Sequence, residues 1–229
     1  MTRKTKRAQE IEKIVGNVET FTIEKALDIL LKCPKLKFDQ SVELSIKLGV
    51  DPKKADQQVR GTVSLPHGTG KKMVILVFAK GDKVKEALDA GADYAGHDDL
   101  LEKVKEGWTE FTSVISTPDM MREVGKLGKV LGPRGLMPTP KAGTVTNDIA
   151  KAIKELKAGK VEFKVDKNGV VNSVVGKLSF QMDKLSENVK MLIQAIQRAK
   201  PPASKGIYLQ SCYLSSTMGP GLKIEVQSE

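Results

Sequence analysis

Aromatic side chains are scarce in this sequence, making up only 4% of its 229 residues. Cysteine and histidine are scarcer still, with Cys33, Cys212, His67 and His97 the only examples. Two widely spaced cysteines provide neither a disulfide framework nor a metal-binding pair, so we interpret them as reduced thiols of a cytosolic protein. No apolar run approaches the roughly 18 residues of a membrane span. We therefore expect no membrane partner, no metal site and no other cofactor.

Negative charge is also scarce. The sequence has 38 Lys and Arg residues but only 28 Asp and Glu residues, which gives a net charge of +10. A basic chain with few aromatic rings favours polyanionic partners that are held through their phosphates rather than by stacking. The excess is uneven, at +4 for residues 1–67, +2 for 68–159 and +4 for 160–229. If the two ends fold together, they form the basic part of the molecule.

The order of the apolar patterns predicts two domains. Residues 41–48 alternate between apolar and polar side chains, as in a half-buried strand, whereas residues 73–79 are continuously apolar, as in a covered parallel strand. Helices and strands then alternate until Gly159. We therefore predict an α+β domain from residues 1–67 and 160–229, interrupted by a doubly wound α/β domain at 68–159. Gly68 and Gly159 mark the expected crossings.

The individual elements follow from the same periodicities. We expect helices at residues 7–15, 23–31, 83–90, 98–106, 118–126, 147–157 and 183–199. We expect strands at residues 41–48, 59–65, 73–79, 92–94, 112–116, 161–165, 170–180, 207–214 and 222–226. The Asn168-Gly169 pair is a strong hairpin signal and predicts that strands 161–165 and 170–180 pair with each other.

Two short motifs resemble enzyme signatures but lack their essential parts. Residues 68–72 hold two glycines and two lysines, but a phosphate loop needs four residues between its glycines, Ser or Thr after its Lys, and a helix next. His97 lies beside Asp98 and Asp99, and we interpret this group as a helix cap with a surface histidine, because no nucleophile accompanies it. A small nucleotide-dependent enzyme is therefore the weaker alternative.

Three other segments remain open to two interpretations. Residues 128–141 are rich in Gly and Pro and carry Lys129, Arg134 and Lys141, so they form either an exposed surface loop or a phosphate-facing loop. Residues 215–221 offer hydroxyls and glycines, and form either a plain hairpin turn or a close contact to phosphate and ribose. Phe38 either stacks on a base or sugar, or begins the core.

Several longer stretches together resemble the bacterial family of large ribosomal subunit protein one, the protein of the mobile stalk beside the exit site for tRNA. The stretches are residues 48–63 and 65–71, residues 124–138, which resemble the family signature, and residues 216–221, which resemble its C-terminal RNA-contacting loop. The resemblance covers essentially the whole chain.

The resemblance implies a discontinuous first domain that binds the stalk of large-subunit rRNA, and an inserted Rossmann-like second domain. It also implies a non-enzymatic, cytoplasmic protein of the large subunit, expected to be a monomer when free. The same surface would bind the leader of the protein's own operon mRNA and repress translation, and the stalk would accompany deacylated tRNA as it leaves. By motif match, the RNA contacts would fall on Phe38, Ser41, Glu43, Asp166, Lys167, Gly169, Ser211, Thr217, Met218 and Gly219. The role of Gln40 is left open.

Side-chain chemistry suits these positions. Glu43 cannot meet a phosphate favourably, so it would accept a hydrogen bond from a ribose 2′-hydroxyl or a base amine, which would favour RNA over DNA. Asp166 would act likewise or would brace its own turn. Lys47, Lys37 and Lys167 would neutralise phosphates. A general DNA-binding protein would also fit the charge, but it would not explain the hydroxyl-and-glycine loop or the acidic contacts.

Overall fold

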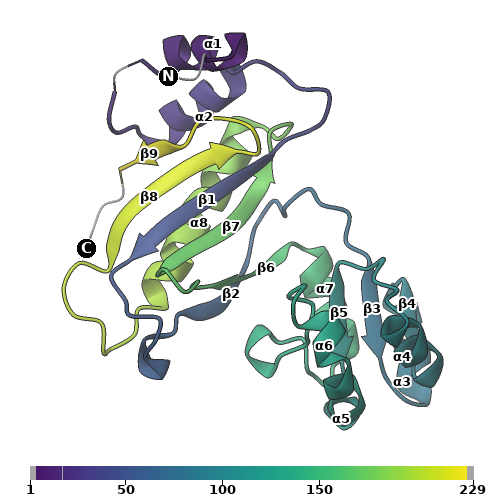
Figure 1. Ribbon diagram of the computed structural model, residues 1–229. Coiled ribbons are helices and arrows are strands. Elements are labelled where there is room, and N and C mark those ends of the chain that lie inside the picture. Colours follow the sequence, from purple (N-terminus) through teal and green to yellow (C-terminus); the bar gives the residue numbers. More distant parts are fainter. Residues whose placement is uncertain (1–3, 17, 226–229) are drawn as a thin grey trace. The chain divides into compact units, whose positions relative to one another are not determined.

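The computed structural model describes residues 4–16 and 18–225, which form two compact units (Figure 1). Unit 1 combines Met1–Lys71 with Val161–Glu229, and unit 2 is Lys72–Lys160. These boundaries fall within a few residues of the expected crossings at Gly68 and Gly159. Both units contain helices and strands, so the mixed α/β fold class is confirmed.

Unit 1 is built around a four-stranded antiparallel sheet in the order β7-β1-β8-β9, and it also contains a two-stranded sheet of β2 and β6. Its elements are α1 (Lys6–Val15), α2 (Ile23–Lys32), β1 (Ser41–Leu48), η1 (Ala55–Gln57), β2 (Arg60–Ser64), β6 (Lys160–Lys164), β7 (Val170–Lys177), α8 (Met182–Arg198), β8 (Leu209–Ser216) and β9 (Leu222–Ile224). Lys160, the first residue of β6, marks the boundary with unit 2.

The four-stranded sheet has one covered face and one open face. Val42, Leu44 and Ile46 of β1 are buried, while the residues between them point to the other side, as the alternation predicts. Helices α2 and α8 pack against the apolar face, with Leu185 and Val189 of α8 fully buried there. Figure 1 shows both helices on the same side of the sheet. The opposite face carries the polar side chains.

The short last strand depends on the N-terminal part of the chain, as expected. Phe21 donates its backbone N–H to the Lys223 carbonyl at 2.9 Å and accepts from the Glu225 N–H at 3.0 Å. The helix that follows, α2, begins where predicted, because the Thr22 side chain accepts from the Lys25 N–H at 3.4 Å. Both ends of the sequence therefore meet in one core.

The expected hairpin at Asn168-Gly169 is only partly right. The turn forms, but β6 pairs with β2 and β7 pairs with β1, so the flanking strands belong to different sheets. A single bridge between Val165 and Val171 joins them. An Asn-Gly pair determines the local turn, whereas the long alternating strand β1 offers β7 a better partner along its whole length.

Unit 2 is a three-stranded parallel sheet in the order β4-β3-β5, covered by helices on both faces. Along β3, Ile75 and Val77 pack on one side, and Leu76 and Phe78 on the other, which explains the continuously apolar sequence. The elements of the unit are β3 (Ile75–Phe78), α3 (Asp82–Asp89), β4 (Tyr94–Gly96), α4 (Asp98–Lys105), β5 (Ser113–Ser116), η2 (Pro118–Met120), α5 (Met121–Val124), η3 (Gly125–Leu127), α6 (Gly128–Leu131), η4 (Pro140–Ala142) and α7 (Ile149–Lys157).

The segment after Pro118 differs from the single helix expected at 118–126. It is a chain of short helical pieces that continues to Leu131, so the stretch 128–141 begins with a helical turn rather than a loop. Leu127 and Leu131 are buried in the core of unit 2. Their burial favours helical turns beyond residue 126, where the helix was expected to end.

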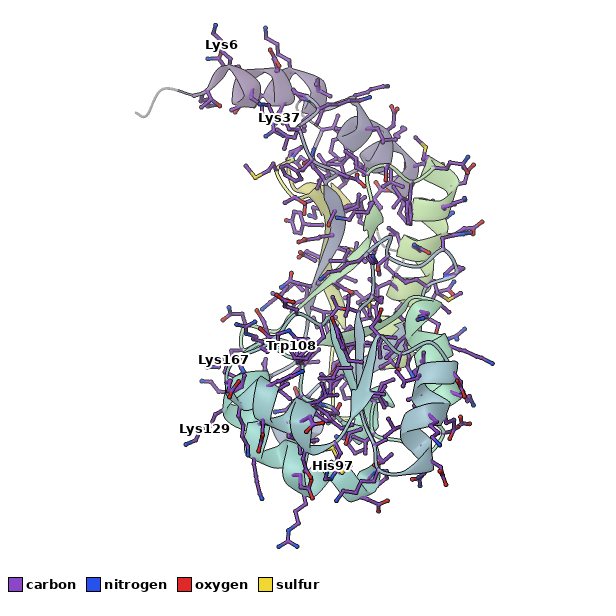
Figure 2. All side chains as sticks on the ribbon, turned by 90° about the vertical axis from the view of Figure 1, so that its right-hand side faces the viewer. Lys6, Lys37, His97, Trp108, Lys129 and Lys167 are labelled. Carbon is purple, nitrogen blue, oxygen red and sulfur yellow. The ribbon has the colours of Figure 1, made fainter. Side chains whose placement is uncertain are left out.

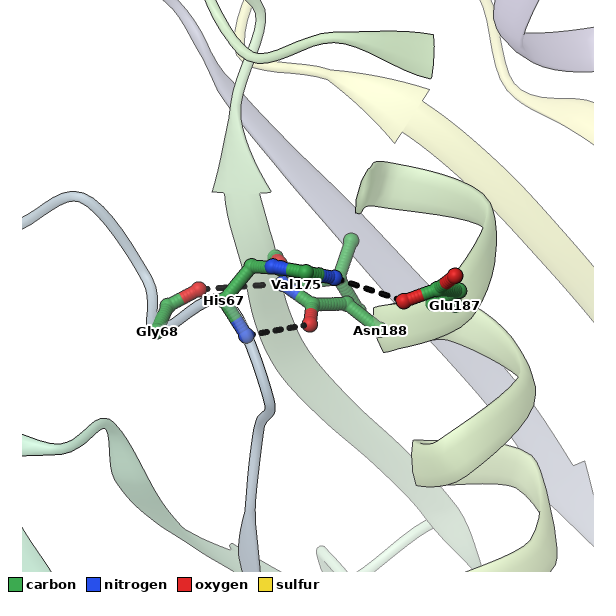
Figure 3. Close-up of polar contacts among 5 residues, drawn as sticks. All are labelled: His67, Gly68, Val175, Glu187 and Asn188. Carbon is green, nitrogen blue, oxygen red and sulfur yellow. Dashed lines mark hydrogen bonds and ion pairs between the residues drawn. The ribbon is translucent and has the colours of Figure 1, made fainter. Parts of the chain in front are cut away.

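A buried asparagine of α8 holds the backbone of His67 and Gly68, shortly before this part of unit 1 ends at Lys71 (Figure 3). Asn188 donates its side-chain N–H groups to the carbonyls of Gly68 at 3.0 Å and Val175 at 2.8 Å, and its Oδ1 accepts from the His67 N–H at 3.3 Å. His67 Nε2 also lies 2.6 Å from a carboxylate oxygen of Glu187. The chain is thus tied to α8 as far as Gly68.

Candidate nucleic-acid interface

The open face of the unit 1 sheet gathers polar side chains from all four strands. We use the term open face for the outward side chains of these strands: Ser41, Glu43, Ser45, Lys47, Val170, Asn172, Val174, Ser211, Tyr213, Ser215 and Lys223. All are exposed or partly exposed. The face presents hydroxyl, amide, carboxylate and ammonium groups, which are the groups that contact phosphate, ribose and base edges.

The strand register places four of the predicted site residues on this face. Glu43 lies opposite Ser215, and Lys47 lies opposite Ser211, in the pairing of β1 with β8. Ser41 stands at the first position of β1. The alternation of β1 therefore places Ser41, Glu43 and Lys47 on one face, and the pairing of β1 with β8 adds Ser211 to it.

The turn at residues 217–221 is fastened to the start of β1. The Thr217 N–H donates to the Ser41 carbonyl at 3.0 Å, and the Ser41 N–H donates to Thr217 Oγ1 at 3.0 Å. The Thr217 hydroxyl is thus already bound within the protein. A side chain at Gly219 would collide with the Ser216 hydroxyl and would force that hydroxyl away from Gln40.

The structure gives Gln40 a definite place, which the sequence left open. Its side chain is only 3% exposed, and its Oε1 accepts from the Ser216 hydroxyl at 3.2 Å and the Met218 N–H at 3.1 Å. Gln40 therefore holds the 217–221 turn from inside the fold. The Met218 side chain stands outward in consequence, 56% exposed.

Phe38 belongs to the same end of β1 and is 52% exposed, so it does not begin the core. The loop that carries it is fixed by Asp39, whose carboxylate accepts from the Ser179 N–H at 3.2 Å and the Ser179 hydroxyl at 2.8 Å. Lys177 donates to the Ser41 hydroxyl at 3.0 Å. An exposed ring and an exposed thioether thus stand at one end of the open face, on well-braced backbone.

Asp166, Lys167 and Gly169 lie at the other end of β1. Asp166 Oδ1 accepts from the N–H groups of Asn168 and Val170, each at 2.8 Å, so this oxygen braces its own turn. The Gly169 carbonyl accepts from the Leu48 N–H at 2.8 Å, and Lys47 donates to the Asn168 carbonyl. Lys167 is exposed, and Figure 2 shows Lys37 and Lys167 at opposite ends of the unit.

The predicted contacts therefore form two groups joined by the open face, rather than one cluster. The eight residues of β1 separate the groups, and at about 3.3 Å per residue the strand spans about 23 Å. A ligand that touches both ends would need to run along the sheet.

Sequence reasoning missed Tyr213, which stands in the middle of the open face. It is 42% exposed and lies between Ser45 and Lys223 in the strand register. The buried neighbours Cys212 and Leu214 give the signal that could have found it, because alternation along β8 places Tyr213 outward.

The three predicted basic residues of unit 2 are exposed but come from different short segments. Lys129, labelled in Figure 2, lies in α6, Lys141 lies in η4, and Arg134 lies in the loop between them. The Arg134 guanidinium donates to the Thr109 hydroxyl.

Buried titratable groups in unit 1 are kept neutral rather than activated. Burial raises the pKa of the Cys212 thiol and of the Tyr208 hydroxyl, each to about 12. Burial also raises the pKa of Cys33, partly offset by the nearby charge of Arg7. A reactive cysteine needs a lowered pKa and exposure, so these thiols fit the expected reduced, structural state.

One group among the described residues has the side chains of a metal site. His97, Asp98 and Glu123 each offer a ligand atom, all within 4.8 Å of one another. The carboxylates, however, face different nitrogens of the ring, Asp98 at Nδ1 and Glu123 at Nε2, and Lys80 approaches the second Glu123 oxygen at 3.1 Å. This arrangement is a cluster of polar side chains at the start of α4 that includes the ion pair of Lys80 with Glu123. The cap residue is His97, whose side chain makes no capping bond, whereas Asp98 or Asp99 was expected to cap the helix; both acids lie in its first turn instead.

Within residues 4–16 and 18–225, no helix is both long and apolar enough to cross a membrane.

Comparison with known proteins finds a family that matches most of the sequence. The model of the ribosomal protein L1p/L10e family matches residues 30–220. The chain is 69% identical to the large ribosomal subunit protein uL1 of Protochlamydia amoebophila (strain UWE25) over 227 residues, covering 99% of this chain and 96% of that protein. It is 60% identical to the protein of the same name from Chlamydia caviae and 51% identical to that from Kosmotoga olearia, each covering 99% of this chain and 98% of the relative.

Proposed function

Because the chain belongs to the ribosomal protein L1p/L10e family, and is thus a protein of the large ribosomal subunit and not an enzyme, we propose that it binds the stalk of large-subunit rRNA through unit 1. The binding surface consists of the open face with the turns at 166–169 and 217–221. The observation that carries this proposal is the fastening of the 217–221 turn to β1, which presents Met218 outward from a rigid backbone.

Net charge and the individual side chains contribute to RNA binding in different ways. Residues 1–71 and 161–229 together carry a net charge of +8, against +2 for residues 72–160, so long-range attraction draws RNA to unit 1. Selection then depends on the groups of the open face. Glu43 is exposed between Val174 and Ser215, where its carboxylate accepts from a ribose 2′-hydroxyl or a base amine.

Two finer activities rest on the same surface and on the inserted unit. Unit 1 binds the leader of the protein's own operon mRNA in competition with rRNA, which represses translation when rRNA is scarce. The exposed cations Lys129, Lys141 and Arg134 of unit 2 face phosphates as the stalk accompanies deacylated tRNA from the exit site. The protein works in the cytoplasm, within the large subunit, and is a monomer when free.

The test compares two exposed methionines of unit 1. Met218→Ala removes a side chain from the 217–221 turn, whereas Met191→Ala removes one that is 40% exposed on α8, behind the sheet. A single specific contact to nucleic acid contributes about 1–3 kcal/mol. We therefore expect Met218→Ala to weaken binding of a stalk rRNA transcript by about 5- to 150-fold, with Met191→Ala unchanged, in titrations at fixed salt.

A DNA copy of the same transcript should lose specific binding, because it offers Glu43 no 2′-hydroxyl. If the two methionine variants bound the RNA with equal affinity, the 217–221 turn would not be part of the interface. Equal affinity for RNA and DNA would contradict the role of Glu43.

A further inference from the structure

A hollow adjoins the open face at the end of β1 that carries the 166–169 turn. It has a volume of about 680 Å³ and is lined by Lys47, Leu48, Gly49, Val50, Lys205, Ile207 and Gln210. Pockets for small organic ligands fall in a range of about 300–1,000 Å³, so there is room for a nucleotide. None of the predicted contacts except Lys47 belongs to this lining.

The floor of the hollow is formed by backbone in close approach. The Gly49 N–H donates to the Tyr208 carbonyl at 2.7 Å, and a side chain at Gly49 would collide with the Ile207 carbonyl. The Gln210 amide nitrogen lies 3.4 Å from the place where that side chain would begin. Glycine at position 49 therefore lets the loop before β8 pack against the end of β1, with Gln210 lying across the junction.

The wall chemistry fits an anionic ligand with a flat apolar part. Ile207 is 71% exposed, an unusual state for a large apolar side chain, and Val50 beside it is half-buried. Lys47 and Lys205 supply two ammonium groups, and the lining contains no carboxylate. Gln210 adds an exposed amide that both donates and accepts hydrogen bonds.

The hollow is continuous with the proposed RNA surface. Lys47 belongs to both, and it lies opposite Ser211, the neighbour of Gln210 in β8. Lys47 also donates to the Asn168 carbonyl of the 166–169 turn. RNA that follows the open face to this end of β1 passes directly over the hollow.

We propose that the hollow holds a single unstacked nucleotide of the bound RNA, an inference that rests on the proposed function. The base lies against Ile207 and Val50, its edge meets the Gln210 amide, and the adjoining phosphate is neutralised by Lys205. Proteins that recognise RNA by sequence mostly read such splayed-out bases by apolar contact and by hydrogen bonds to their edges. The hollow thus makes this end of the sheet a site of sequence selection.

The experiment measures binding of the stalk rRNA transcript to full-length variants. Ile207→Ala and Gln210→Ala should each weaken binding by at least about fivefold, as expected for loss of contact to one base. Matched controls are Val18→Ala, at an exposed apolar residue, and Gln194→Ala, at an exposed amide of α8. Because Ile207 and Gln210 are exposed, all four variants should keep the wild-type melting temperature.

An abasic scan of the transcript then identifies the nucleotide. One abasic position should weaken binding to the wild type and have no further effect on the Ile207→Ala/Gln210→Ala double variant. Lys205→Gln should reduce the slope of log affinity against log salt by about one phosphate contact.

Full affinity in both single variants, or an abasic scan in which every loss is the same in wild type and double variant, would overturn the hollow as a nucleotide site. If Met218→Ala still weakened binding in that case, the proposed function would stand without the hollow. A wild-type protein that failed to distinguish the transcript from a scrambled duplex would instead contradict the proposed function itself.

Discussion

At the scale of single residues, Gln40 links the fold to the proposed contact surface. Gln40→Ala leaves the Met218 N–H and the Ser216 hydroxyl without their acceptor in a site where the Gln40 side chain is only 3% exposed. We expect a loss of about 1–3 kcal/mol in the free energy of unfolding, measured by urea denaturation. RNA binding should weaken as well, because the turn that presents Met218 loses its inner support.

The control for this variant is Gln194→Ala, since Gln194 is exposed on α8 and its loss should leave stability and RNA binding unchanged. If Gln40→Ala unfolded at the wild-type urea concentration and bound RNA as tightly, the amide would not be what holds the turn.

The same residues show which parts of the site could be predicted from the sequence. Strict alternation along β1 was enough to place Glu43 and Lys47 on one face, because side chains of a strand point to opposite sides in turn. Gln40 lies one residue before that pattern begins, and its burial depends on the 217–221 turn, more than 170 residues away. Asp166 was open to two interpretations because only the folded turn shows that Oδ1 accepts from its own backbone.

At the scale of elements, α8 stabilises unit 1 through Asn188 as well as through its apolar stripe. Asn188→Ala removes the partner of two carbonyls and one N–H, so we expect a loss of at least about 2 kcal/mol in unfolding free energy. Asn188→Asp should lose more at neutral pH, because it puts a buried carboxylate against the carbonyls of Gly68 and Val175.

The pH dependence separates the two variants. Burial raises the pKa of a carboxyl group at this position, so the unfolded state ionises first and stability falls as pH rises. Asn188→Asp should therefore regain stability as the pH is lowered towards 4, whereas Asn188→Ala should follow the wild type. Urea denaturation at several pH values, with Asn172→Ala on the exposed side of β7 as the control, checks this. Parallel pH profiles for the two variants would contradict the buried contact.

The helices and strands were easier to predict from the sequence than the pairing of the strands. Most helices and strands lie within a few residues of the expected positions, because amphipathic periodicity and caps such as Thr22 act locally. The pairing of β6 with β2, and of β7 with β1, is settled by which strands bury their apolar faces together. A local Asn-Gly signal carries no information about that choice.

At the scale of the whole molecule, unit 1 has a hydrophobic core of its own, which predicts that it folds without the inserted unit 2. The buried residues of its core lie between Phe21 and Leu65 and between Phe163 and Ile224, with none from 72–160. The chain leaves unit 1 after Lys71 and re-enters it in β6, which pairs with β2 of the same unit, so a Gly-Ser linker can replace the insertion between residues 71 and 161.

We expect the joined protein, residues 1–71 and 161–229 with a short Gly-Ser linker, to unfold cooperatively and to bind the stalk rRNA transcript with near-full affinity. Its net charge of +8 should preserve most of the salt dependence. Unit 2 alone, residues 72–160 with a net charge of +2, serves as the comparison and should bind this transcript only weakly. A joined protein that folds but no longer prefers the stalk transcript to a scrambled duplex would show that unit 1 lacks part of the selective surface. If it bound both equally with a steep salt slope, charge would remain its only contribution.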